Sequence, residues 1–374
     1  MAHGSVLVVG RRVILQIGLV AWLALAPGHG RGQEAAATAI VADRPAPATL
    51  LTRIAFGSCA DQRLPQPIWT AIAATNPDLF LFLGDNVYAT QYATTKGLAG
   101  LDRAYREFAG VLAFDRFRRQ VPVLATWDDH DYGLNDGGVE LPFKSQAKDR
   151  LLDFFGVPAD APVRGHAGVY QAATFGPEGR RVQIILLDTR WSRSPLKPTD
   201  QRGAPGKERY VPDPNPRKTI LGPIQWAWLE KQFRQPAEVR LLVSSIQVVA
   251  DGHGYERWGN LPAERQKLYD LIRRTGTGGV IVLSGDRHLG ALYRLDGDGV
   301  GYPLYEITSS ALNRGRDADP DEFGPHQLFP AYGPNNFGLV TVNWQHKVLS
   351  LDLMAEDGDR VRGMTIPFGD LRAD

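Results

Sequence analysis

One stretch decides the fold: LFLFLGDNVY, which occupies residues Leu79 to Tyr88. Five large apolar residues follow one another without alternation and stop at Gly84, and the carboxylate of Asp85 comes next. A short, continuous apolar run bounded by a turn signal is typical of a strand that is buried on both faces of a layered sheet. Ligands of such sheets bind beyond the carboxyl ends of the strands. The stretch therefore predicts that Asp85 and Tyr88 lie where chemistry takes place.

The rest of the chain alternates strands with helices. Short apolar runs that predict strands occur at residues 50–56, 121–126, 182–188, 239–246 and 279–285, and half-buried alternation occurs at 291–310 and 337–354. Helical spacing of apolar residues occurs at 68–75, 98–119, 145–155, 224–233 and 262–274. Because strand, polar turn and helix recur through the first 290 residues, we expect an α/β fold with helices outside a layered sheet. We assign residues 50–374 to a single domain.

Residues 1–35 predict a signal peptide. An Arg-Arg pair at 11–12 precedes an apolar stretch at 13–26, and small residues follow. The apolar stretch is shorter than the ~20 residues of a spanning helix, and the arginine pair resembles a twin-arginine leader. The alternative interpretation is an uncleaved membrane anchor. With an Ala/Pro-rich spacer at 36–49, the pattern predicts an exported protein, periplasmic or secreted, that uses the twin-arginine or general export machinery.

The composition is that of an ordinary globular protein. The 374 residues are 43% hydrophobic, which is enough for a large core, and the net charge of +1 shows no nucleic-acid-binding footprint. Residues 192–222 are rich in Pro, Lys, Arg and Gly without any period, which predicts a long functional surface loop. With Trp191 beside it, this loop offers one way to contact a membrane surface.

Four predicted strands end in side chains that bind metals. The groups are Cys59; Asp85 with Tyr88; Asp128, Asp129, His130 and Asp131; and Asp286 with His288. Taken singly, each has a structural explanation, such as a helix cap, a solvated turn or an interior histidine. When the four groups are considered together, we expect them to lie at one edge of one sheet. So many carboxylates at one place would repel one another unless cations lay between them. Carboxylates suit calcium, magnesium or manganese, whereas a thiolate and a phenolate suit a ferric ion.

These residues also carry a family resemblance. The segments Gly57-Ser-Cys59, Gly84-Asp-Asn-Val-Tyr88, Trp127-Asp-Asp-His-Asp131 and Ser284-Gly-Asp-Arg-His288 resemble alkaline phosphatase D-type (PhoD-like) metallophosphoesterases. Further similar blocks are Leu187-Asp-Thr-Arg190, Pro262-Ala-Glu-Arg265 and Asn336-Phe-Gly338, so that the resemblance covers about residues 52–345. It implies a four-layer αββα sandwich of two packed mixed sheets flanked by helices. It also implies Fe3+ and Ca2+ as cofactors and hydrolysis of phosphate esters.

The resemblance assigns roles residue by residue. Asp85 resembles the carboxylate that is shared between the metals. The residues that would complete the iron site are Cys59, Tyr88 and His288. The residues that would hold calcium, or alternatively Mn2+, Mg2+ or Zn2+, are Asp129, Asn135 and Asp286. Two departures stand out: the similarity starts near residue 50, so we expect no accessory N-terminal β-domain, and Asp-Asp-His-Asp replaces Asp-Asp-His-Glu, which predicts a branch with its own substrate.

The chemistry expected is hydrolysis by a hydroxide that the metals make available for attack on phosphorus. His130 would aid the leaving group, Asp131 lies beside it, and Arg190 would clamp the phosphate substrate because a guanidinium matches phosphate oxygens in a bidentate way. The first alternative is a phospholipase D-type phosphodiesterase acting on phospholipid head groups. The second is a binding module without turnover, against which the complete acid and imidazole sets argue.

Overall fold

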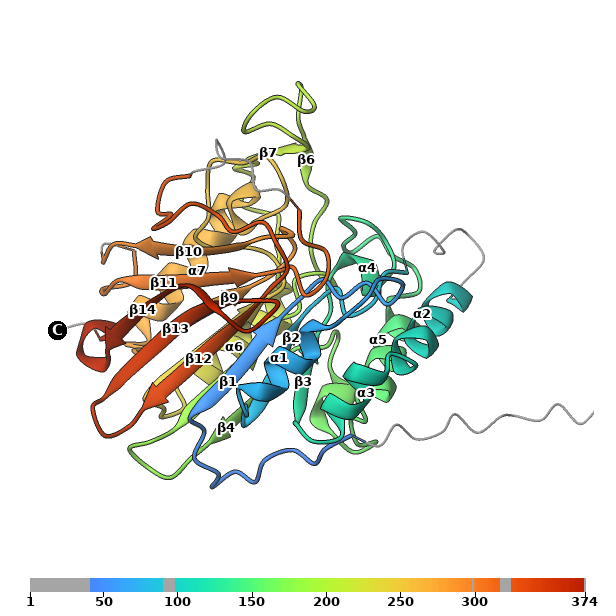
Figure 1. Ribbon diagram of the computed structural model, residues 1–374. Helices are drawn as coiled ribbons and strands as arrows, with labels where there is room; N and C mark the ends of the chain where they lie inside the picture. Colours follow the sequence, from blue (N-terminus) through green and yellow to red (C-terminus); the bar gives the residue numbers. More distant parts are fainter. Residues whose placement is uncertain (1–40, 90–97, 298, 317–323, 373–374) are drawn as a thin grey trace, which may run out of the picture. The chain divides into compact units, whose positions relative to one another are not determined.

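Two mixed sheets form the centre of the domain (Figure 1). The structure, a computed structural model, describes residues 41–89, 98–297, 299–316 and 324–372. Within these ranges, the first six-stranded sheet has the order β14 (Arg360–Pro367), β13 (Val348–Ala355), β12 (Asn336–Asn343), β1 (Arg53–Gly57), β2 (Leu79–Leu83), β3 (Val123–Thr126). The second has the order β10 (Gly290–Leu295), β11 (Leu304–Ser309), β9 (Val280–Ser284), β8 (Val239–Ser244), β5 (Val182–Leu186), β4 (Gln171–Phe175). A small ribbon pairs β6 (Lys197–Pro198) with β7 (Tyr210–Val211).

Helices cover the outer face of each sheet. Apolar residues of the first sheet pack against α1, α2, α3 and α5, and those of the second sheet pack against α6 and α7. The α-helices are α1 (Ile68–Ala74), α2 (Ala99–Ala109), α3 (Leu112–Arg118), α4 (Asp129–Tyr132), α5 (Lys144–Phe154), α6 (Gly222–Phe233) and α7 (Pro262–Arg274). Short 3-10 turns are η1 (Pro162–Gly165), η2 (Trp258–Asn260) and η3 (Phe368–Leu371).

The packing of strand β2 on both of its faces explains why its sequence does not alternate apolar and polar residues. Leu79, Leu81 and Leu83 belong to the apolar core that also contains residues of the second sheet. Phe80 and Phe82 belong to the core under the helices, where the Phe80 ring lies 5.3 Å from that of Trp69. Because both faces of the strand are covered, both sets of side chains are apolar. The four-layer αββα fold expected from the sequence is confirmed.

The directions of the central strands bring their carboxyl ends together. Strands β1, β2 and β3 run parallel in the first sheet, and β5, β8, β9 and β11 run parallel in the second. The remaining strands of both sheets, which are β4, β10, β12, β13 and β14, extend them in the antiparallel sense. The turns that follow the parallel strands therefore carry the site.

The predicted helices and strands all occur, with shifts of a few residues at their ends. Strands β4 and β14 and the single-turn helix α4 were not predicted, because edge strands are only partly buried and their apolar pattern is weak. The predicted signal peptide 1–35 lies outside the described residues. In the part of the predicted spacer that is described, the Ala42 N–H donates to the Arg118 carbonyl at 2.7 Å and the Gly176 N–H donates to the Pro47 carbonyl at 2.8 Å.

Candidate metal centre

The candidate metal-binding side chains come from both sheets. Cys59, Asp85 and Asp128 each stand two residues beyond the end of β1, β2 or β3 of the first sheet. Asp286 stands two residues beyond the end of β9, which belongs to the second sheet. The expectation that all groups share one edge of one sheet is therefore wrong. The sandwich stacks two sheets whose strand ends face a common space, which the order of strands in the sequence does not reveal.

The potential metal ligands fall into groups, which we call donor groups. The first donor group combines a thiol, a carboxylate, a phenol and an imidazole. The Cys59 thiol donates to Asp85 Oδ2 at 3.5 Å, and the Tyr88 hydroxyl donates to the same oxygen at 3.2 Å. The Tyr88 oxygen also lies 2.8 Å from His288 Nε2. Ligand atoms of Cys59, Asp85 and His288 all lie within 4.8 Å of one another. The four residues that the sequence assigns to one site thus lie together.

Two further donor groups adjoin the first. Asp85, Asp129 and His130 form one group, and Asp128, Asp129 and Asp286 form the other, each with ligand atoms within 4.8 Å of one another. Asp85 belongs to two of the three groups, and so does Asp129. Among the described atoms, buried Asp129 Oδ1 has no hydrogen-bond donor, whereas Asp129 Oδ2 accepts the Asp136 N–H at 2.7 Å. One oxygen of Asp129 is thus held in place, and the other lies 4.0 Å from His130 Nε2.

The backbone at this site adopts a conformation that L-residues avoid. Cys59, Asp85, Asp286 and His288 have φ values of 63°, 50°, 73° and 55°. Left-handed non-glycine residues cost of order 1–3 kcal/mol each and gather at functional sites. Gly84, with a φ of 113°, precedes Asp85, and a Cβ there would lie 2.6 Å from the Asp128 Cβ. The strand-end turns therefore aim these side chains into the shared space at the expense of local strain.

Electrostatics favour cations in this space. Burial and the neighbouring carboxylates raise the pKa of Asp85 and of Asp286 well above the usual range. Burial and the charge of Asp85 likewise raise the pKa of the Cys59 thiol. Asp129 is the exception, because His130 and Arg190 outweigh its burial and lower its pKa to about 2. Two carboxyl groups and a thiol that resist ionisation together fit a site in which metal ions supply the missing positive charge.

The structure gives Asp131 a structural role. Its buried carboxylate accepts the Asp128 N–H at 2.7 Å, which closes a capping box around α4, and it also accepts the Asn86 N–H at 3.2 Å and a bond from the Asn86 side chain. These bonds join the turn after β3 to the turn after β2. Both oxygens of Asp131 face main-chain and amide donors of these turns, and its catalytic role stays a prediction.

Arg190 is fully buried and does not line the cavity described below. Its side chain is 0% exposed, its Nε lies 2.7 Å from Asp128 Oδ1, and its Nη1 lies 2.6 Å from Glu256 Oε2. Arg193 pairs with the other oxygen of Glu256 at 3.0 Å. Burial raises the pKa of Asp128 to about 7 even beside this arginine. These contacts contradict the predicted substrate clamp: Arg190 neutralises the carboxylates beneath the site instead.

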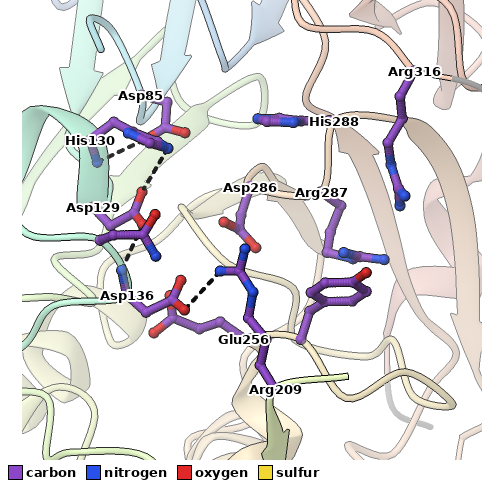
Figure 2. A pocket seen from close by; sticks show the side chains of 12 residues that line it. Asp85, Asp129, His130, Asp136, Arg209, Glu256, Asp286, Arg287, His288 and Arg316 are labelled. Atoms are coloured by element: carbon purple, nitrogen blue, oxygen red, sulfur yellow. Dashed lines mark hydrogen bonds and ion pairs between the residues drawn. The ribbon is translucent and has the colours of Figure 1, made fainter. Parts of the chain in front are cut away.

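A cavity of about 160 Å³ opens onto the donor groups (Figure 2). His130 lies in its wall, with its ring centroid 4.1 Å from that of Tyr88 and its main-chain N–H donating to Asp85 Oδ1 at 3.2 Å. Burial lowers the pKa of His130, and the neighbouring Asp129 carboxylate acts in the opposite direction. Asn135, the remaining predicted ligand, also lines this cavity.

The cavity is also lined by arginines that the sequence only partly indicated. Arg209 Nη1 pairs with Asp136 Oδ2 at 2.9 Å, and the Arg287 guanidinium lies 4.2 Å from the centroid of the Tyr255 ring. Arg316 also lines the cavity (Figure 2). Of these residues, only Arg287 stands inside a motif. Arg209 and Tyr255 lie in irregular segments, where no periodicity predicts which way a side chain points.

Loop 192–222 contributes Arg209 to the lining of this cavity. The main-chain N–H groups of Arg209 and Tyr210 both donate to the Gly254 carbonyl, at 3.0 and 2.7 Å. Within 192–222, which the structure describes throughout, no large apolar side chain is exposed. Membrane contact through this loop stays a prediction, as does the phospholipase D-type alternative, which a comparison of lecithin vesicles with a soluble diester would test. No helix in the described ranges has the length and apolar character needed to cross a bilayer.

Comparisons with known proteins agree with this geometry. The model of a family described as PhoD-like phosphatase matches residues 54–332. The chain belongs to the PhoD-like phosphatase family. The resemblance predicted from the motifs is thereby confirmed, and the matched range contains every candidate donor from Cys59 to His288.

Three known proteins show how far the likeness extends. Alkaline phosphatase D of Bacillus subtilis (strain 168) is 24% identical over 351 residues, which cover 77% of this chain and 57% of that protein. The chain thus spans little more than half the length of this relative. A structure of PhoD superposes with a TM-score of 0.66 at 20% identity, covering 86% of this chain and 70% of the other. The crystal structure of a dimetal phosphatase from Danio rerio superposes with a TM-score of 0.51 at 12% identity, covering 86% of this chain and 100% of the other.

Proposed function

We propose that this chain is a metal-dependent phosphoric ester hydrolase of the alkaline phosphatase D type, acting on phosphomonoesters or phosphodiesters. One observation carries the proposal: Asp85 belongs at once to a donor group with Cys59 and His288 and to another with Asp129 and His130. A carboxylate shared in this way suits two metal ions held side by side, as in two-metal hydrolases. The family of the chain supports the same reaction.

The donor types support one Fe3+ and one Ca2+. A thiolate and a phenolate beside Asp85 and His288 suit the ferric ion, whereas the all-oxygen set of Asp129, Asn135 and Asp286 suits calcium or another hard divalent ion. Metal ions in these positions would neutralise the phosphoryl oxygens and lower the pKa of a water nucleophile. Cys59 and Tyr88, whose pKa values burial raises, would have to give up their protons when the ferric ion binds.

The residues around the cavity would bind and orient the ester. His130, which lines the cavity next to Asp85, is positioned to aid the leaving oxygen. Arg209 and Arg287 also line the cavity, and guanidinium groups match phosphate oxygens in a bidentate way. They take over the clamp role that the sequence assigned to Arg190. Asp136 holds Arg209 in place through their ion pair at 2.9 Å.

The test is hydrolysis of p-nitrophenyl phosphate and of its bis-ester by the purified protein and by Asp85→Ala. We expect the substitution to abolish turnover of both esters. Asp102→Ala, which removes a partly exposed carboxylate paired with Arg150 on the outer helices, serves as the matched control and should turn over normally. Normal turnover by Asp85→Ala would contradict the assignment. Metal analysis of the freshly purified protein should give iron near one equivalent, and zinc alone would rule out the ferric site.

We also propose that the protein is exported, with a signal peptide at 1–35, a spacer at 36–49 and a single catalytic domain at 50–374. The basic pair and the apolar stretch within 11–26 support this proposal. Cell fractionation and N-terminal sequencing of the mature protein test it. Retention of residues 1–35 on a cytoplasmic product would contradict it.

A further inference from the structure

Tyr88 differs from its three partner donors in how it is held. Cys59, Asp85 and His288 each stand on a left-handed residue in the turn after a strand, so the backbone itself aims their short side chains. Tyr88 lies five residues past the end of β2, in a segment without helix or strand. Its oxygen also stands at the far end of a long side chain, where a small backbone movement displaces it strongly. Some other device must therefore hold the phenol against Asp85 and His288.

That device is the side-chain amide of Gln62. Gln62 Oε1 accepts the Tyr88 N–H at 2.8 Å, and Gln62 Nε2 donates to the Tyr88 carbonyl at 3.1 Å. One amide thus satisfies both main-chain polar groups of one residue, as a neighbouring strand would. Gln62 is only 7% exposed, so water competes little for these two bonds.

The segment that carries Gln62 is clamped in the same way. Asn313 Oδ1 accepts the Asp61 N–H at 2.7 Å, and Asn313 Nδ2 donates to the Asp61 carbonyl at 2.8 Å. The next residue, Arg314, reaches Asp61 Oδ2 at 3.4 Å and places its guanidinium 4.9 Å from the centroid of the Tyr88 ring. Residues from the turn after β1 and from the segment after β11 therefore hold Tyr88 by its backbone and by its ring.

We propose that Gln62 is a positioning residue that sets the Tyr88 phenol in the metal site, with Asn313 holding the segment of Gln62 in place. The inference rests on the proposed function, since it concerns a ligand of that site. When the amide is lost, Tyr88 moves away while Cys59, Asp85 and His288 keep their positions on their turns. The metal then stays bound through three donors and loses the phenolate.

The test compares Gln62→Met with Gln66→Met, using Tyr88→Phe as the reference for a lost phenolate. Methionine has a similar length and cannot form the two bonds. Gln66 is a matched control because it is 6% exposed on the same segment and bonds to Trp69 and to the Asp61 carbonyl instead of Tyr88. Asn313 still holds both main-chain groups of Asp61 when Gln66 is replaced. Each protein is loaded with ferric ion, and three quantities are measured: iron content, the phenolate-to-iron absorption band, and iron affinity in competition with a chelator.

We expect Gln62→Met to retain iron at saturation, to lose most of the absorption band as Tyr88→Phe does, and to bind iron ~10–100-fold more weakly, the usual effect of removing a residue that orients a ligand. Gln66→Met should keep the band and the affinity. Equal bands and affinities in the two methionine variants would overturn the proposal. So would loss of all iron from Gln62→Met at saturation, because the site as a whole would then have collapsed.

A separate readout distinguishes this inference from the proposed function. If the wild-type protein neither hydrolyses the esters nor takes up iron, the proposed function fails. The pair of hydrogen bonds between Gln62 and Tyr88 is then tested by amide hydrogen exchange of the metal-free proteins. The Tyr88 N–H should then exchange at least ~10-fold faster in Gln62→Met than in Gln66→Met, because its acceptor is gone. Equal exchange rates would overturn the proposal.

Discussion

Arg190→Gln distinguishes a structural arginine from one that binds substrate. Arg190 is fully buried between Asp128 and Glu256, whose side chains are each 1% exposed. Removing one partner of a buried ion pair leaves an uncompensated charge and costs about 3–5 kcal/mol. Arg193 still neutralises Glu256 in part, so the cost falls mainly on Asp128. We therefore expect a large loss of stability, and any loss of activity should follow from displacement of Asp128 beneath the site.

Arg209→Gln is the matched control. Arg209 lines the cavity, its side chain is 40% exposed, and it pairs with one carboxylate, that of Asp136. An ion pair this accessible contributes at most about 1 kcal/mol. We expect Arg209→Gln to raise KM for p-nitrophenyl phosphate with little change in stability, which is the reverse of the expectation for Arg190→Gln.

Thermal unfolding followed by circular dichroism measures the difference. A domain of this size has an unfolding entropy of about 0.7 kcal/mol per kelvin, so a loss of 3–5 kcal/mol lowers Tm by about 4–7 °C. Arg209→Gln should lower Tm by less than about 2 °C. The reasoning is refuted if Arg190→Gln keeps the wild-type Tm and raises KM alone, because Arg190 would then act on the substrate.

Three further outcomes are expected. First, the pKa values of Asp85 and Asp286 in the metal-free folded protein are raised above the unfolded value of about 3.9. Their contribution to stability is therefore full below that pH and is lost as pH rises through the folded pKa values. Urea titrations with a chelator should show a lower free energy of unfolding at pH 8 than at pH 5, and added divalent ions should restore more of that free energy at pH 8. Gly84→Ala should lower kcat/KM by about 100-fold, because its φ is 113° and the new Cβ would displace Asp128; unchanged kinetics would contradict the packing at this turn. Glu306→Gln should cost about 1–3 kcal/mol in urea unfolding, because its carboxylate accepts three consecutive main-chain N–H groups, and wild-type stability would contradict that role.

The layer structure followed from local pattern. Phe80 and Phe82 alternate with leucines in one apolar run, and only a strand covered on both faces makes such a run favourable. Because Asp85 and Asp286 each come two residues after such a strand, they stood out before any geometry was known. Edge strands such as β14 were missed, since partial burial imposes no clear period on their sequence.

The roles of the arginines did not follow from pattern. Arg190 follows strand β5 by four residues, in the turn where a substrate clamp would stand, yet it lies between two buried carboxylates. Arg209 comes from a loop without periodicity and lines the cavity instead. Position along a strand predicts which end of the sheet a residue occupies, but the direction of a long side chain depends on partners that are distant in sequence.

The amino-acid sequence by itself determined the layered fold, the family and the positions of the metal-binding side chains at strand ends, because burial on both faces and the turn chemistry after each strand act over a few neighbouring residues. Only the tertiary structure decided that the donors come from two sheets, that Asp85 is shared between donor groups, and that Gln62 holds Tyr88. These relations join segments that are far apart in the chain, and their distances arise only when the two sheets pack together.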